Sequence, residues 1–415
     1  NGREMFADDF DFGQLIDTRE RRQIVGDFRV DPIDIFAGRT YPDSVAVSRS
    51  NFDTHGFTVH PLFVVKPPDR EDIDAYVPLR ALLARDLGNV MATGLGLSGH
   101  RDAMPVLRMQ ACTQNHAFAA GTAAALAVKA HTTLRQLDLA PLRRHMVDLG
   151  ILPAEALDHA DNFPASDEAM HDAIANGLDS YRDLAVLMSD PERAGVLLQS
   201  SLAAASDDAL RCRMAMLLAV MGDDAGSDIL LQRLDADAWD EGWNYRGMGQ
   251  FGMSLSELDR TIVALAMARE TRTLPRLLNL ARQLDADHAF SHHRATAIAC
   301  EAFADPDAAP VLAEVLHKPN LRGHAFRDMA VIRRGLPESS TENTPRNNAL
   351  RELHLARALF RCGDHDGLGE AVLREYAQDF RGCFARHARA VLSGAPGREA
   401  EPLCEPRGEA APLGA

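Results

Sequence analysis

The sequence has no apolar stretch of membrane-spanning length and no closely spaced cysteine pair. A transmembrane helix needs roughly 20 consecutive apolar residues, and the longest candidate, "AFAAGTAAALAVKA", is shorter and consists mostly of small residues. The six cysteines are scattered without C-x-x-C spacing, which favours free thiols over a disulfide framework or a zinc site. The opening "NGREMFADDFDFG" is not typical of a signal peptide. We therefore expect a cytoplasmic protein without a metal centre.

The chain also has fewer basic than acidic residues. The chain carries 44 Lys and Arg against 60 Asp and Glu, a formal net charge of -16. Such a balance argues against nucleic acid or an anionic membrane as the main partner. The 46% hydrophobic and 25% charged content is that of an ordinary globular protein. At 415 residues, the chain is long enough for two or three domains.

A complete dinucleotide-binding fingerprint is missing as well. Gly94, Gly96 and Gly99 spell G-x-G-x-x-G after an apolar run. The fingerprint requires a helix that opens at once on the pyrophosphate and an acidic residue about 20 positions later. Pro105 places the helix start beyond the glycines, and no Asp or Glu occurs between Ala103 and Leu137. These glycines therefore do not predict a pyrophosphate site.

Two kinds of pattern divide the chain. Residues 1–150 mix short β-like runs with one strong helix from about Pro105 to Ala130, which predicts an α/β fold. The β-like runs are "RRQIVGDFRV", "DSVAVSRS", "FTVHPLFVV" and "NVMATG". Residues 151–188 are expected to be a helical linker.

Helical patterns with recurring starts fill the rest of the chain. "MSDPERAGVLLQSSL" and "FADPDAAPVLAEVLHK" each place Asp, or Asp then Pro, before an apolar helix face. Recurring helix pairs indicate a solenoid, because one pair cannot bury its own apolar face. We predict an all-α HEAT-like repeat domain over residues 189–393 that folds independently. Residues 394–415, rich in Gly, Pro, Ala and Glu, are predicted to be a disordered tail.

The first 130 residues resemble the C-terminal half of the FAD-dependent oxidoreductase family, which has a glutathione-reductase-like flavin fold. Six ordered blocks carry the resemblance: "TRERRQIVG" (Thr18–Gly26), "AGRTYPDSVA" (Ala37–Ala46), "DTH" (Asp53–His55), "YVPLRALL" (Tyr76–Leu83), "NVMATG" (Asn89–Gly94) and "RMQACTQNHAFAAGTAAALA" (Arg108–Ala127). The resemblance implies FAD as cofactor and oxidation of a small organic substrate by hydride transfer. It also implies a partial flavin-binding domain that lacks its N-terminal βαβ unit.

The resemblance also implies a flavin-contacting region. In the family, the block equivalent to "ATG" runs under the flavin, and the following helix points its N-terminus at the ring. Helix N–H groups stabilise negative charge on N1 and O2 of a reduced flavin. The expected cofactor contacts are Thr93, Gly94, Met104, Pro105, Val106, Leu107 and Arg108. For Arg108, contact with flavin O2, with a substrate carboxylate, or an ordinary ion pair all remain open.

His55 and His100 are the candidate acid–base residues, because flavin oxidation of a C–OH or C–N bond usually needs a base. The sequence departs from the family here: Arg101 stands where the family has His, and His100 comes one residue early. The alternative is that both are surface or core histidines. Cys112 is expected to be a buried thiol, with a covalent flavin link as the alternative.

Two further segments allow more than one interpretation. "HAFSHHRA" (His288–Ala295) clusters three histidines, and we expect a solvated helix start rather than a metal site. "WDEGWNYRGMGQF" holds both tryptophans. It is expected to cover the active site, to dock a partner, or to pack on its own repeat.

The family's phosphate-binding G-x-G-x-x-G lies upstream of the blocks found here. The resemblance therefore predicts a second polypeptide, either a subunit or a cleaved N-terminal half, that carries this motif and completes the sheet. The rival hypothesis is a non-catalytic helical-repeat scaffold, with a degenerate flavin fold, that binds a protein partner.

Overall fold

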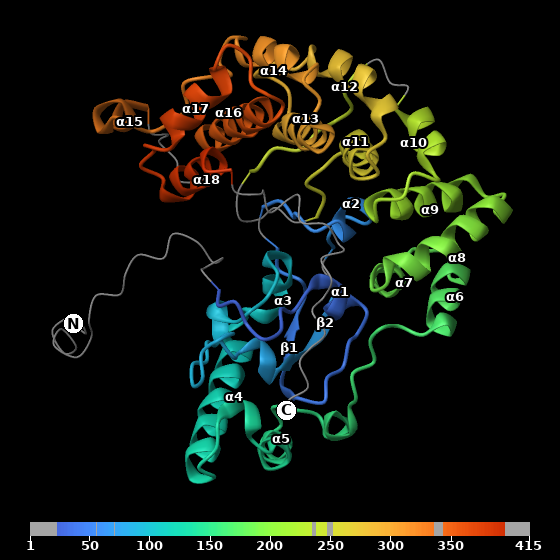
Figure 1. Cartoon of the computed structure of the whole chain (residues 1–415), viewed down its shortest axis with the longest axis vertical. Helices are drawn as coiled ribbons and strands as arrows, with labels where there is room; N and C mark the ends of the chain where they lie inside the picture. The colour runs from blue at the N-terminus through green and yellow to red at the C-terminus, as the bar shows by residue number, and fades with distance from the viewer. Residues whose placement is uncertain are drawn as a thin grey trace.

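A computed structural model describes residues 23–54, 56–69, 71–234, 238–246, 252–335 and 343–394. Figure 1 shows a small sheet with helices α1, α3, α4 and α5 around it, and a long succession of helices that curves away in an arc. The α/β character of the first part and the helical character of the rest agree with the sequence. One hydrophobic core cluster includes buried residues of both parts.

The sheet consists of two antiparallel strands, β1 (Ser44–Ser50) and β2 (Ile73–Pro78). Ser44 lies opposite Pro78, and Ser50 lies opposite Ile73. The strand expected in "DSVAVSRS" is confirmed. β2 continues into the 3-10 helix η1 (Leu79–Ala81), whose three residues are buried. The shortness of the sheet follows from Pro78, because proline cannot donate to a strand ladder.

Three isolated bridges connect the remaining extended segments: Gly26 with Ala84, Val30 with Gly99, and Leu83 with Met91. "RRQIVGDFRV" and "NVMATG" therefore contribute single bridges rather than strands within the described residues. Gly26 is required where it stands, because a Cβ there would lie 2.6 Å from Ser98 Cβ.

The strand expected in "FTVHPLFVV" is wrong. Its second half forms the short helix α2 (Leu62–Val65), with Leu62, Phe63 and Val64 buried. Pro61 precedes the helix, and its fixed φ suits a helix start. Short apolar runs do not distinguish a buried helix from a buried strand, and here the run packs among aromatic rings, with Phe63 stacked on Phe52 at 5.2 Å.

The single helix expected from Pro105 is two helices. α3 (Met104–Leu107) ends at Arg108, and α4 (Gln110–Lys129) begins after Met109, whose φ and ψ of -63° and 145° are extended. α4 packs its Cys112 and His116 side toward β1 and also contacts α5 (Leu139–Asp148). The long helix of the first part therefore begins at Gln110 rather than at Pro105.

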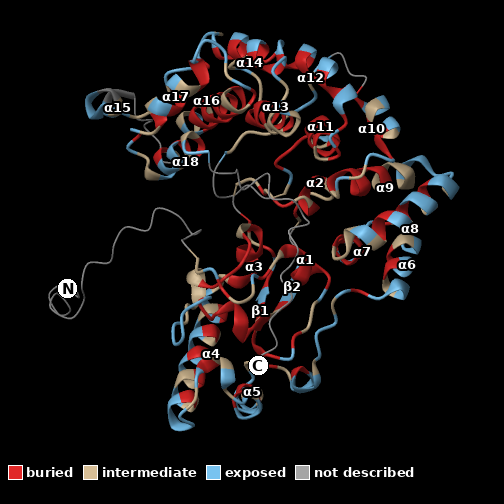
Figure 2. Ribbon diagram, in the orientation of Figure 1, coloured by how far each residue is buried: buried red, intermediate tan, exposed pale blue. Residues whose placement is uncertain are grey.

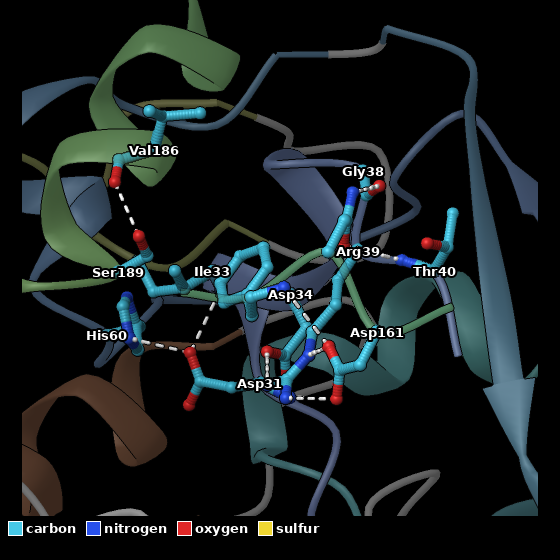
Figure 3. A network of polar contacts seen from close by, with 12 residues as sticks. Asp31, Ile33, Asp34, Gly38, Arg39, Thr40, His60, Asp161, Val186 and Ser189 are labelled. Carbon is cyan, nitrogen blue, oxygen red and sulfur yellow. Dashed lines mark hydrogen bonds and ion pairs between the residues drawn. The ribbon is translucent and has the colours of Figure 1, made fainter. Parts of the chain in front are cut away.

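A polar network fastens the segment after α5 to α1 (Pro32–Phe36). Arg39 donates to Asp34 at 3.0 Å and, through two nitrogens, to Asp161 at 2.9 and 2.8 Å (Figure 3). A bidentate arginine–carboxylate pair is strongly oriented. The predicted linker is therefore held against the first part before α6 (Asp167–Ala175) and α7 (Tyr181–Met188) begin.

The arc continues the helical part. Its helices are α8 (Pro191–Ala204), α9 (Asp208–Val220), α10 (Ser227–Arg233), α11 (Glu257–Met267), α12 (Leu274–Ala281), α13 (Phe290–Phe303), α14 (Ala308–Leu316), α15 (Met329–Gly335), α16 (Thr344–Arg361), α17 (Leu368–Tyr376) and α18 (Gly382–Leu392). Helices α9, α11, α13 and α16 contact one another in that order, and α10, α12, α14 and α17 pack beside them. Asp190, Asp207 and Ser256 accept backbone N–H groups at the starts of α8, α9 and α11, as N-cap residues do.

The HEAT-like assignment of residues 189–393 stays a prediction. The predicted tail lies outside the described residues except for Gly394. Among the helices that the structure describes, none is long and apolar enough to cross a membrane.

Candidate flavin-binding site

The start of α4 is the first component of the site. Met109 is its N-cap, and no side chain caps the helix there. Gln110 and Ala111 are exposed. The first N–H groups of an α-helix have no partner within the helix, and they carry partial positive charge. An α-helix of 20 residues thus presents backbone donors that suit an electron-rich ring edge or another anionic group.

A glycine turn lies beside this helix start. Gly94 opens the 3-10 helix η2 (Gly94–Gly96), which follows the extended Thr93. Gly94 has a φ of 60°, and a Cβ there would be 3.6 Å from Thr113 of α4. The left-handed backbone favours glycine at this position, and the turn lies close to α4. Thr93 and Gly94 are half-buried, which fits contact with a planar ligand.

Met104, Pro105, Val106 and Leu107 fit a different role from the one expected. Met104, Val106 and Leu107 are 0–1% exposed, and Pro105 is buried with them. Any contact of these residues with a cofactor would therefore be through the backbone. The donors that remain accessible belong to the first turn of α4, a few residues further along the chain.

Arg108 connects the helix start to the segment around Asp53. Its Nη2 donates to Asp53 O at 2.6 Å and lies 3.6 Å from the Asp53 carboxylate. The Arg108 side chain is 7% exposed. The geometry thus favours the ion-pair alternative for Arg108 and brings two of the six resemblance blocks into contact.

His100 lies in a polar cluster behind the turn. Its Nδ1 accepts the Asp102 N–H at 3.0 Å, so in the neutral ring Nε2 carries the proton. Burial lowers the pKa of His100 to about 4, although Asp102 acts in the opposite direction. Both ring nitrogens of the neutral His100 are therefore used, so the ring accepts a proton only when Nδ1 releases the Asp102 N–H. His55, the other candidate, lies outside the described residues.

Asp102 organises the same cluster. Its Oδ2 accepts the N–H groups of Val59 and His60, each at 2.7 Å, and its Oδ1 accepts Arg101 Nη1 at 2.8 Å. Burial by itself raises the pKa of Asp102, but Arg101, His100 and the two backbone donors outweigh it, so the pKa is lowered. Asp102 is therefore a buried carboxylate that fixes the backbone before α2.

His60 joins this cluster to α1. Its Nδ1 accepts the Leu62 N–H at 3.1 Å, and its Nε2 lies 3.2 Å from Asp31 Oδ1 (Figure 3). The rings of His60 and His100 meet edge to face, with centroids 5.2 Å apart. Asp31 also caps α1 through the Ile33 N–H. The cluster thus extends from His100 to the partly exposed Asp31.

Cys112 and His116 face β1 from α4. The Cys112 thiol is buried and lies 3.4 Å from the Arg49 N–H, as expected for a packed thiol; a covalent flavin link remains untested. His116 Nε2 lies 2.9 Å from Ser48 Oγ, and burial lowers the His116 pKa to about 4. Both side chains lie on the packed face of the helix.

The solvated helix start expected at His288–Ala295 is wrong in one respect. α13 does begin there, at Phe290, but His292, His293 and Arg294 are at most 2% exposed. His292 lies 2.7 Å from Asp259 of α11, and Arg294 donates to Thr58 O at 2.7 Å. No group of three metal-ligating side chains occurs within the described ranges.

The tryptophan segment packs on the arc. The Trp243 N–H donates to Ser291 Oγ at 2.9 Å, and Tyr245 and Asn347 exchange two hydrogen bonds at 3.2 and 3.0 Å. Tyr245 also borders Gly56, where a Cβ would lie 3.6 Å from its ring. The described part of this segment, residues 238–246, therefore packs on its own helices and touches the first part of the chain.

Comparison with known proteins agrees with the resemblance. Residues 4–146 match the model of a family described as FAD dependent oxidoreductase. No curated protein matches the chain, and no solved structure does. The match supports the FAD-dependent oxidoreductase family for this part of the chain, and FAD is the cofactor of that family. The turn at Gly94 and the start of α4 lie inside the matched range.

Proposed function

We propose that the chain forms part of an FAD-dependent oxidoreductase that oxidises a small organic substrate. The observation that carries the proposal is the uncapped start of α4 beside the Gly94 turn, inside the range that matches the family. When bound, FAD supplies the hydride acceptor. The first N–H groups of α4 would donate to the bound flavin, and Thr93 and Gly94 would contact it.

The chain's own residues also account for the proton. Oxidation of a C–OH or C–N bond releases a proton as the hydride leaves. His100, neutral at pH 7, is the described candidate for accepting it, at Nδ1, once this atom releases the Asp102 N–H that it accepts in the structure. Arg101 donates to Phe57 O and Arg108 donates to Asp53 O, so the two arginines hold the backbone of Asp53 and Phe57 against the His100 region. His55 stays a second candidate base.

Flavin content tests the proposal. The protein purified from its native source should show flavin absorbance, and the released cofactor should be FAD by mass spectrometry. Protein without bound flavin that also fails to bind added FAD in the native assembly would favour the non-catalytic scaffold instead.

We further propose that a second polypeptide completes the flavin domain. The second half of α4 is apolar on two sides: one face is buried against β1, whereas Phe118 and Val128 on the other are 46% and 74% exposed. Figure 2 shows both buried and exposed residues along α4. Gly121 and Ala125 lie on the same exposed face. Large apolar side chains exposed together often mark an interaction surface, which supports a partner, carrying G-x-G-x-x-G, that covers this face.

Size-exclusion chromatography with mass spectrometry of the native protein tests the second polypeptide. We expect a flavin-loaded assembly with a second chain or a cleaved N-terminal piece. A flavin-loaded assembly that contains only this chain would show this part of the proposal to be wrong.

A further inference from the structure

The segment Phe57–His60 is held by both parts of the chain. From the flavin side, Arg101 Nη1 donates to Phe57 O at 2.5 Å, and Asp102 accepts the Val59 and His60 N–H groups. From the arc, Arg294 Nη2 of α13 donates to Thr58 O at 2.7 Å. Two consecutive carbonyls therefore bind guanidinium groups that lie far apart in the sequence.

The Phe57 ring adds a second set of contacts. Arg294 Cζ lies 4.5 Å and Arg101 Cζ lies 5.5 Å from its centroid. The ring also packs near Phe290 at 5.8 Å and near His354 at 6.5 Å, which come from α13 and α16. A desolvated cation–aromatic contact is stronger than an exposed one, and Arg294 is 2% exposed.

We propose that Arg294 is a positioning residue of the flavin site: it fixes the Phe57–His60 segment, and through it the Asp102–His100 pair, from the helical arc. A role for Arg294 in catalysis rests on the proposed function. The structural claim is that the contact of Arg294 in α13 with Thr58 O sets the backbone geometry beside His100. The helical part is thereby a structural component of the site rather than an appended module.

Hydrogen exchange on the full chain tests the inference. In Arg294→Gln, the Val59 and His60 amides should exchange about tenfold faster or more, because the segment loses a charged donor and a stacked cation. Arg294→Lys keeps the charge without the planar fork and should restore part of the protection. Arg260→Gln is the matched control: Arg260 Nη1 donates to Val65 O at 3.0 Å, so its loss should act on α2 and spare Val59 and His60.

A second measurement separates positioning from general loosening. In Arg294→Gln, the His100 pKa followed by NMR should rise from about 4 toward the ordinary histidine value, and Arg260→Gln should leave it unchanged. Should Arg294→Gln fail to fold, Phe57→Leu removes the aromatic face with little change in apolar character and should give a smaller shift in the same direction. Unchanged exchange and an unchanged His100 pKa in a folded Arg294 variant would overturn the inference.

The outcomes distinguish the inference from the function on which it rests. Faster exchange in an Arg294 variant of a protein that binds no FAD would support the coupling between the arc and the Phe57–His60 segment but contradict the flavin site. FAD binding with unchanged exchange would keep the function and reject the role of Arg294.

Discussion

Three imidazoles make this protein sensitive to mild acid. Burial lowers the pKa of His100 and of His116 to about 4, and that of His293 to about 3. Each ring is neutral in the folded chain but gains a proton below about pH 6.5 in the unfolded chain. The unfolded state then binds more protons than the folded state. The three histidines therefore leave the free energy of unfolding unchanged above pH 6.5 and lower it as the pH falls below 6.5.

Replacing one of these rings should reduce the acid sensitivity. In His116→Phe, the free energy of unfolding should fall between pH 7 and pH 5 by about 2 kcal/mol less than in the wild type, because one proton uptake is removed. Urea unfolding at pH 7 and pH 5 measures the change in the free energy of unfolding. The exposed His145, replaced by Gln, is the control. An equal fall in His116→Phe and the wild type would contradict the assignment.

Asp259 and His292 form a buried pair with the opposite pH dependence. The carboxylate lies 2.7 Å from His292 Nδ1, and both residues are at most 2% exposed. Burial lowers the pKa of His292, but Asp259 outweighs burial and raises it overall. The pair therefore contributes stability below pH 6.5 that is lost as the pH rises through the folded-state pKa.

Asp259→Asn should destabilise the chain by about 3 kcal/mol near pH 6, since it removes one partner of a buried pair. The loss should be smaller at pH 9. Unfolding experiments at both pH values measure this difference. Asp228→Asn, which removes an exposed partner of Arg272, should change stability by less than about 1 kcal/mol. A similar loss in the two variants would argue against a buried charged pair.

At the scale of elements, the turn at Gly94 allows a matched comparison. Gly94 and Gly150 have φ values of 60° and 70°, so leucine at either position strains the backbone by about 1 kcal/mol or more. Only Gly94 borders α4. Gly94→Leu should lower FAD retention at least tenfold, and Gly150→Leu should leave it near the wild-type level. Flavin absorbance after gel filtration measures retention, and equal retention would remove the turn from the site.

The exposed face of α4 provides a test for the second polypeptide. Gly121→Arg places a charge where no atom lies within 4 Å of the added Cβ, so the isolated chain should keep its thermal stability. Assembly with the partner should be lost, because a cation would be buried in an apolar interface. Lys129→Glu, at the end of the same helix, is the control. Normal assembly by Gly121→Arg would place the partner elsewhere.

Some elements were predictable from local sequence. β1 follows from the β-like run "DSVAVSRS", and the start of α8 follows from Asp190 before Pro191. The identity of α2 was not predictable, because a short apolar run does not distinguish strand from helix. The break at Arg108 and Met109 gave no local signal either, since the residues on both sides favour a helix and the break coincides with the contact of Arg108 with Asp53.

At the scale of the whole molecule, the two parts share one core. α2 contacts α7, α9 and α11, and Arg260 and Arg294 donate to carbonyls of the first part. Sequence reasoning proposed Gly94 and His100 as site residues through the resemblance, and both stay predictions. It missed Asp102 and His60, for which the dense grouping of His, Arg and Asp around them was a signal. Arg294 gave none, because its partner lies 236 positions away.

Residues 189–393, expressed alone, should keep their helices but melt at a lower temperature. The fragment loses the buried α2 and the carbonyl partners of two arginines, and a loss of a few kcal/mol in a chain of this size corresponds to roughly 5 to 10 °C. Circular dichroism of the fragment and the full chain measures the difference. An identical melting temperature would show that the contacts of α2, Arg260 and Arg294 between the two parts contribute nothing to stability.

The location of the flavin in the native assembly tests the central claim most directly. An experimental structure of the FAD-loaded protein should show the pyrimidine edge of the ring within hydrogen-bond distance of the first N–H groups of α4 and its face against Thr93 and Gly94. A bound flavin whose ring touches neither the start of α4 nor this turn would contradict the account.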